Sequence, residues 1–157
     1  MGPVTDAELI RALEALSLPF ADWTHRAHVR VAFAYPRQLP FDPALARMRA
    51  TIRAYNAHNR VPESPTRGYN ETTTRAMMHL VAATTAAYDS THPAADGDAF
   101  CDAHPQLMTK HVLRLFYSPQ QRMRPEAKTQ FVEPDLAPPP RITAGPRLIP
   151  GDVPTSV

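Results

Sequence analysis

The segment NETTTRAMMHLVAATTAAY, residues 70–88, decides the fold. Its apolar side chains recur at the spacing of one helical face: Met77, Met78, Val81 and Ala82. Glu71 is an acid in what would be the first turn, where the helix dipole favours negative charge. The threonines of this segment lower its intrinsic helix propensity without excluding a helix. We therefore predict a long helix that begins near Asn70 and ends at Tyr88.

Helical patterns precede this segment. The first predicted helix begins with the capping box of Thr5 and Glu8 and ends before Pro19. The second runs from Asp22 or Thr24 to Tyr35, where Pro36 stops it. The third begins with the cap Asp42 and Pro43 and ends near His58. The residues that follow include Asn59, Pro62, Pro65 and Gly68, so a loop is predicted before the long helix.

Shorter helices and a proline-rich segment complete the chain. Helices are predicted over residues 99–104, 107–116 and 125–131. After Val132 prolines become frequent and no helix can continue. No alternating β pattern and no internal repeat is present. The sequence therefore predicts an all-α fold, an irregular helical bundle over residues 1–137, followed by a Pro-rich arm over residues 138–157 that is extended or disordered.

The composition narrows the classes of function. The chain has 157 residues and a net charge of +2, with Lys and Arg scattered among acids, so we predict no nucleic-acid partner. Cys101 is the single cysteine, which excludes an internal disulfide and a multi-thiolate metal site and fits a reducing cytoplasm. Apolar runs are too short for a membrane span, so we predict no membrane partner. We expect a bacterial, cytoplasmic protein, and a homodimer is possible.

Two histidines are the first candidates for chemistry. His25 and His28 are three residues apart, which places both rings on one face of a helix about one turn from each other. Two imidazoles and a carboxylate from a facing helix suit zinc or non-haem iron, and Glu71 is the best candidate for that third ligand. A structural alternative stays open, in which the histidines are half-buried packing residues and Glu71 only caps its helix.

Several short motifs together carry a family resemblance. They are Trp23-Thr24-His25-Arg26-Ala27-His28-Val29, His58, Gly68-Tyr69-Asn70-Glu71-Thr72, Tyr117-Ser118 and Phe131-Val132-Glu133-Pro134-Asp135-Leu136. With them the chain resembles a widespread family of small uncharacterised bacterial helical proteins over roughly residues 20–137. The resemblance implies a site rich in histidine and glutamate that the two-histidine and glutamate segments share, and it supplies no reaction. This chain departs from the pattern at Asn70, where the family usually has histidine, so a nitrogen ligand is missing if that histidine binds a metal.

Three hypotheses of function follow. The first is a metal-dependent biosynthetic enzyme that acts on a small organic molecule, with iron or zinc held by His25, His28 and Glu71. Its other site residues are predicted as Glu71, Tyr69 and His58 for catalysis and Asn70 and Trp23 for substrate binding. The second is a metal-free acid–base enzyme, an isomerase, lyase or cyclase, in which His25 or His28 is the base and Glu71 orients it. The third is a non-catalytic helical module that binds a ligand or a partner.

Overall fold

The computed structural model describes residues 4–143, and in this range the fold is all-α. This range contains six α-helices: α1 (Asp6–Glu14), α2 (His25–Gln38), α3 (Phe41–His58), α4 (Glu71–Tyr88), α5 (Gly97–Ala103) and α6 (Pro119–Arg122). Four 3₁₀ turns are η1 (Phe20–Asp22), η2 (Pro105–Leu107), η3 (Lys110–Leu115) and η4 (Pro125–Lys128). None of the helices in the described part of the chain has the length and hydrophobicity that a membrane-spanning segment needs.

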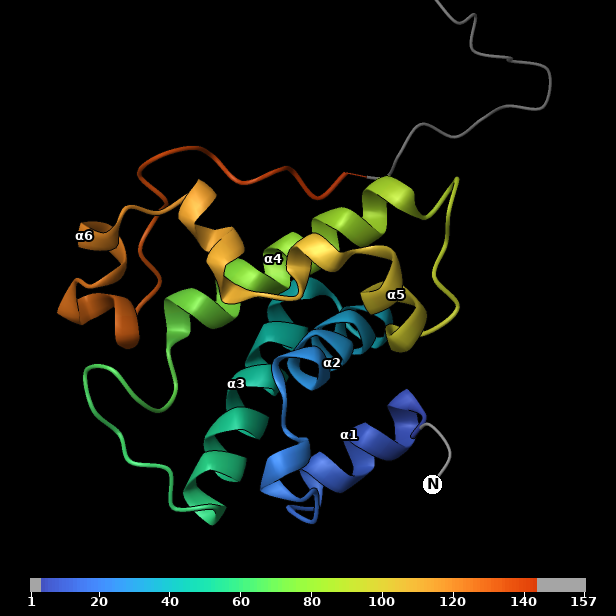
Figure 1. The fold of residues 1–157 in the computed structure, drawn as a ribbon, viewed down its shortest axis with the longest axis horizontal. Helices are drawn as coiled ribbons and strands as arrows, with labels where there is room; N and C mark the ends of the chain where they lie inside the picture. Colours follow the sequence, from blue (N-terminus) through green and yellow to red (C-terminus); the bar gives the residue numbers. More distant parts are fainter. Residues whose placement is uncertain (1–3, 144–157) are drawn as a thin grey trace, which may run out of the picture.

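The bundle is organised around α2. It contacts α1, α3, α4 and α5, and Figure 1 shows it in the middle of these four helices. Its inward face is apolar, with Val31 and Tyr35 fully buried. Burial of this kind stabilises the fold by roughly 1.5–3 kcal/mol for each large apolar side chain. Both candidate histidines lie at the N-terminus of α2.

Local capping signals set two of the helix starts as predicted. Thr5 and Glu8 form the reciprocal capping box of α1. The side chain of Asn70 accepts a hydrogen bond from the backbone N–H of Thr73, 2.9 Å away, so α4 begins at Glu71 and runs to Tyr88.

Prolines produced two errors in the prediction. Pro36 does not stop α2, because it lies in the last turn, where its missing N–H removes one hydrogen bond and no later turn depends on it. The helix ends after Gln38, where the backbone N–H of Leu39 donates a hydrogen bond to the carbonyl of Tyr35 at 3.0 Å. Asp42 is not the cap of α3, since Pro40 already holds the extended backbone at that point and Asp42 lies in the first turn.

The later helices differ from the predicted ones. The Asp96 side chain accepts from the N–H of Ala99, so α5 begins at Gly97, two residues earlier than predicted. The predicted helix over residues 107–116 is wrong: Thr109 is extended and its hydroxyl accepts from the N–H of His111, which divides the segment into η2 and η3. The predicted helix from residue 125 is the short turn η4.

The C-terminal segment lies along α4. The hydroxyl of Thr72 donates to the carbonyl of Gln130 at 3.0 Å and accepts from the N–H of Val132 at 3.2 Å. Further on, His79 Nε2 lies 2.6 Å from the carbonyl oxygen of Pro140, and Figure 1 shows this segment running back over α4. Residues 138–143 have no helix or strand. The rest of the predicted tail, residues 144–157, lies outside the described residues.

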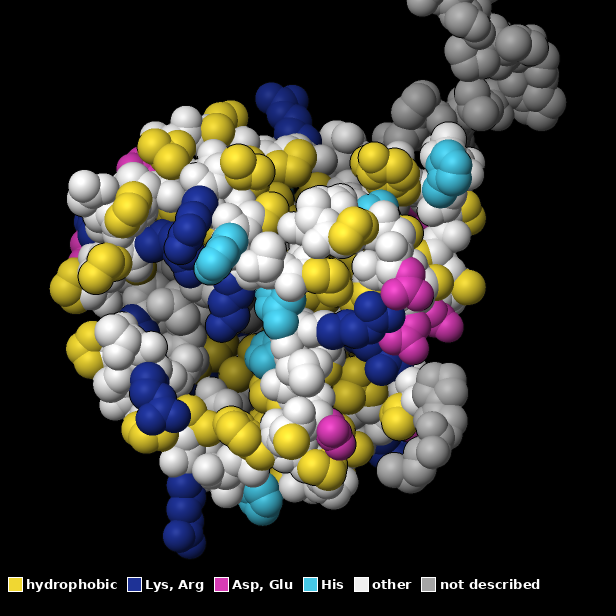
Figure 2. Space-filling view, in the orientation of Figure 1, with side chains coloured by type: hydrophobic (Ala, Val, Ile, Leu, Met, Phe, Trp, Pro, Cys, Tyr) yellow, Lys and Arg dark blue, Asp and Glu magenta, His cyan; other side chains and the backbone are white. Residues whose placement is uncertain are grey.

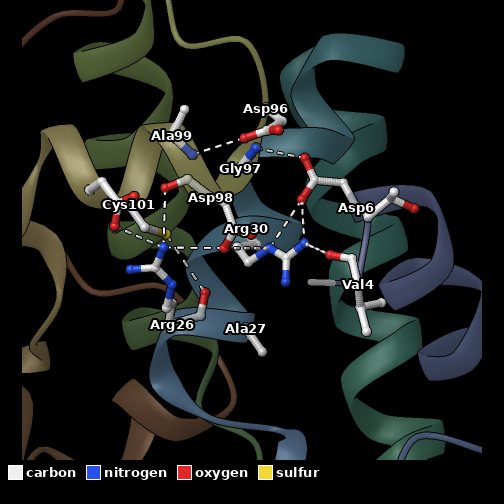
Figure 3. A network of polar contacts seen from close by, with 12 residues as sticks. Val4, Asp6, Arg26, Ala27, Arg30, Asp96, Gly97, Asp98, Ala99 and Cys101 are labelled. Carbon is white, nitrogen blue, oxygen red and sulfur yellow. Dashed lines mark hydrogen bonds and ion pairs between the residues drawn. The ribbon is translucent and has the colours of Figure 1, made fainter. Parts of the chain in front are cut away.

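A network of charges joins α1, α2 and α5 (Figure 3). Arg30 of α2 donates from Nε to Asp6 Oδ1 at 3.1 Å, and only 12% of its side chain is exposed. The other oxygen of Asp6 accepts from the backbone N–H of Gly97 at 2.6 Å. A Cβ atom at Gly97 would lie 2.7 Å from Asp6 Oδ1 and 3.1 Å from Arg30 Cβ. The absence of a side chain at Gly97 therefore lets α5 approach the other two helices.

We expect Gly97→Ala to lower the free energy of unfolding by about 1–2 kcal/mol, because the new methyl group displaces the Asp6 carboxylate. Urea-induced unfolding followed by circular dichroism measures this. In an Asp6→Ala background the same substitution should cost much less, since the obstructing oxygen is gone. An equal cost in both backgrounds would show that the contact between residues 6 and 97 is not responsible.

Candidate functional site

An open cavity lies between the N-terminus of α2, the middle of α3 and the first half of α4, and we call it the Trp23 cavity. It has a volume of about 270 Å³, and η1, η3 and the loop before α4 complete its wall. Most of its lining is apolar, including Trp23, Met48, Ile52, Met77 and Met78. Its polar lining groups include His25, His28, Asn56, Asn70, Thr73 and Lys110. Figure 2 shows a hollow on this face of the molecule with Lys, Arg and His side chains beside it.

His28 lies in the wall of the Trp23 cavity in one fixed orientation. Its ring stacks on the indole of Trp23, with 3.7 Å between the ring centroids and 28° between the planes. Its Nδ1 is 2.8 Å from the carbonyl oxygen of Thr24. Because a carbonyl can only accept, Nδ1 carries the proton and the neutral ring has its lone pair on Nε2. Within the described residues, Nε2 has no hydrogen-bond partner.

The environment of His28 keeps the imidazole uncharged. Burial is the main reason that the pKa of His28 falls from 6.5 to about 4, and the positive charge of Lys110 contributes to this lowering, while the hydrogen bond to the Thr24 carbonyl opposes it. At neutral pH the ring is therefore a hydrogen-bond acceptor with an available lone pair.

His25 shares the cavity and has the opposite tautomer. Its Nε2 lies 2.9 Å from the carbonyl oxygen of Leu107, so Nε2 is the protonated nitrogen and Nδ1 has the lone pair. A backbone carbonyl thus fixes the orientation of each histidine. Ligand-binding and metal-binding histidines commonly have such a partner on the second ring nitrogen.

Glu71 belongs to a different cluster. It is 7% exposed and does not line the Trp23 cavity. Arg49 of α3 binds both of its oxygens, with Nε 2.9 Å from Oε2, and the Tyr69 hydroxyl donates to Oε2 at 2.5 Å. The hydrogen bonds from Arg49 lower the pKa of Glu71, so the carboxylate stays charged at neutral pH. The structure therefore brings His25 and His28 together but does not bring Glu71 to them.

The positions of His25, His28 and Glu71 decide whether these residues can bind one metal ion together. Within residues 4–143, no group of three or more His, Cys, Asp or Glu side chains is placed to hold a metal ion. The two histidines offer one nitrogen each, and the oxygens of Glu71 are held by Arg49 and Tyr69. The residues present do not fit a three-ligand iron or zinc centre, and metal binding stays a prediction.

The other predicted site residues fall into two groups. Trp23, Asn70 and Tyr69 line the Trp23 cavity, although the Tyr69 hydroxyl is used by Glu71 and the Asn70 oxygen caps α4. His58 is exposed at the end of α3 and is not among the residues that line the cavity.

Sequence reasoning missed Lys110 and Thr73 as cavity residues. Thr73 follows Asn70 by three residues on α4, so the helical spacing could have indicated it. Lys110 comes from η3, a segment predicted as α-helix, and no local pattern indicates that it lines the same cavity as His28.

Comparison of the sequence with models of known protein families, with curated proteins and with solved structures finds no match. The family resemblance of the two-histidine and glutamate segments stays a prediction.

Proposed function

We propose that the Trp23 cavity binds a small, largely apolar organic molecule and that His28 Nε2 accepts a hydrogen bond from it. The observation that carries this proposal is the orientation of His28. Its ring is held by Thr24 on one edge and Trp23 on one face, and its lone pair has no partner among the described residues. Apolar walls with a few oriented polar groups are typical of small-molecule sites.

The size of the Trp23 cavity sets the size of the ligand. An engineered apolar cavity of about 150 Å³ binds benzene. At about 270 Å³, the Trp23 cavity has room for a ring of that size with a short polar substituent. Methionines such as Met48 and Met78 give the wall some adaptability, because their side chains are unbranched and flexible.

Catalysis by proton transfer is the second candidate, and the paired histidines favour it. His25 and His28 each present one available nitrogen, and the carbonyls of Leu107 and Thr24 orient them. This arrangement suits a metal-free isomerase, lyase or cyclase, with the two carbonyls in the orienting role first predicted for Glu71. The low pKa of His28 makes it a weak base in the free protein, so binding is the better supported function.

The chain contains a built-in reporter for the test. Trp23 is the only tryptophan, and it lines the cavity in contact with His28. Benzyl alcohol can donate a hydrogen bond to Nε2, whereas benzyl methyl ether cannot. We expect benzyl alcohol to change the Trp23 fluorescence with roughly millimolar saturation and to bind several times more tightly than the ether.

Two controls make this titration decisive. Ala32 lines the cavity, so Ala32→Leu adds carbon atoms to its wall and should abolish the response while the fold is retained in circular dichroism. Hexan-1-ol and cyclohexylmethanol cover other ligand shapes. If none of these alcohols produces a saturable change, the proposed function is wrong.

A further inference from the structure

The electrostatics around the Trp23 cavity indicate the class of its ligand. Among the described residues that line the cavity there is one cation, Lys110, and no Asp or Glu. Lys110 is exposed and forms no ion pair with any described residue. It lies close enough to His28 for its charge to lower the pKa of that imidazole. One edge of an otherwise apolar cavity is therefore positively charged.

Arg122 adds a second cation behind the wall of the cavity. Its guanidinium NH2 lies 3.5 Å from the hydroxyl oxygen of Thr73, a residue that lines the cavity. The side chain is partly buried, and this burial together with the nearby charge of Arg114 lowers the pKa of Arg122. Arg122 has no carboxylate partner among the described residues.

Other partly buried arginines of the protein differ from Arg122. Arg30 pairs with Asp6 and Asp98, Arg47 with Glu14, and Arg49 with Glu71. Removal of a guanidinium from water is unfavourable unless an anion compensates it. A ligand with an anionic group close to Thr73 would give Arg122 the carboxylate partner that Arg30, Arg47 and Arg49 already have within the fold.

We propose that the ligand of the Trp23 cavity is a small apolar carboxylic acid whose carboxylate is held between Lys110 and Arg122. The inference rests on the proposed function, because it names the class of molecule that the cavity binds. A carboxylate suits these two side chains, since an ammonium and a guanidinium both donate hydrogen bonds to carboxylate oxygens. The apolar part of the acid would then extend past Thr73 toward Trp23 and Met78.

The bound acid would also change His28. A negative charge at the mouth of the cavity opposes the effect of Lys110 and of burial, so it favours the protonated imidazole. The pKa of His28 should therefore rise when the acid binds. Such a rise would make the histidine a stronger base only while its ligand is present.

The test compares phenylacetate with phenylacetamide, which has nearly the same shape and no charge. We expect phenylacetate to bind at least tenfold more tightly in the Trp23 fluorescence titration, with a smaller preference at raised salt concentration. Lys110→Met and Arg122→Met should each weaken phenylacetate binding by about three- to tenfold and leave phenylacetamide unchanged. The matched control is Arg11→Gln, an exposed arginine of α1 that does not line the cavity, and it should bind both probes as the wild type does.

A second readout separates ligand binding from a structural role. If the role of Arg122 is to bind the ligand carboxylate, Arg122→Met should be as stable as the wild-type protein or more stable, because a partly buried charge without a carboxylate partner is removed. Marked destabilisation, or equal affinity for the two probes, would overturn the inference and leave the proposed function intact. If neither these probes nor the alcohols bind, both proposals are wrong.

Discussion

Replacement of Glu71 with alanine should lower the free energy of unfolding by about 3 kcal/mol. The carboxylate is 7% exposed, Arg49 binds both of its oxygens, and the Tyr69 hydroxyl donates to Oε2. Without it the Tyr69 hydroxyl is buried with no acceptor, and the Arg49 guanidinium, with 35% of its side chain exposed, loses its counter-charge. Loss of one partner from a buried pair costs more than the pair itself contributes, because the other charge stays desolvated.

Chemical denaturation of matched variants measures this cost. Arg124 and Glu126 form an ion pair in which 49% of the arginine side chain and 42% of the glutamate side chain are exposed, so Glu126→Ala should leave the free energy of unfolding almost unchanged. Glu71→Gln should fall between these two variants, since it keeps the shape and loses the charge. A Glu71→Ala protein within about 1 kcal/mol of the wild type would show that this cluster does not stabilise the fold.

The Glu71 cluster also shows where sequence reasoning reaches its limit. The position of Glu71 in the first turn of α4 was predictable, because Asn70 and the apolar spacing of the segment are local signals. Its partner Arg49 lies 22 residues earlier, on another helix. No periodicity encodes which side chain of α3 faces α4, so Glu71 was assigned to the histidines when its oxygens are bound by Arg49 and Tyr69.

For the Trp23 cavity, too, the local positions of residues were predictable and their contacts with distant segments were not. The three-residue spacing of His25 and His28 indicates that they share a helical face, and both line the cavity. Their hydrogen-bond partners were not predictable, since the carbonyl of Leu107 reaches His25 from a segment 82 residues later. Lys110 belongs to the 3₁₀ turn η3 and Arg122 to the four-residue helix α6, and elements this short give helical periodicity little information. Local patterns therefore indicated the first four α-helices, and packing decided which side chains meet.

Protonation of His28 should produce the second large effect, a loss of roughly 2–3 kcal/mol of stability between about pH 7 and pH 4. The pKa of His28 is about 4 in the folded protein, whereas an unfolded chain has the ordinary value of 6.5. Between these values the unfolded state binds more protons than the folded state, so acidification favours unfolding. The stabilisation is complete above about pH 6.5 and is lost as the pH falls toward 4.

Urea unfolding at a series of pH values isolates this contribution through His28→Gln, which cannot take up the proton. In the wild type the free energy of unfolding should fall steeply as the pH is lowered. Burial also lowers the pKa of His104, so the His28→Gln variant should keep a weaker dependence on pH. His58→Gln, which alters an exposed histidine at the end of α3 that does not line the cavity, is the matched control.

Trp23 reports the same protonation event directly, because an imidazolium stacked at 3.7 Å quenches indole fluorescence more strongly than a neutral ring does. The wild-type fluorescence should therefore fall with a midpoint near pH 4, and His28→Gln should lack this transition. A midpoint near 6.5 would contradict the assignment of His28 as a buried, neutral acceptor. If phenylacetate moves the midpoint upward while phenylacetamide does not, the carboxylate lies close to the imidazole, and the neutral histidine of the free protein becomes a base when its ligand is bound.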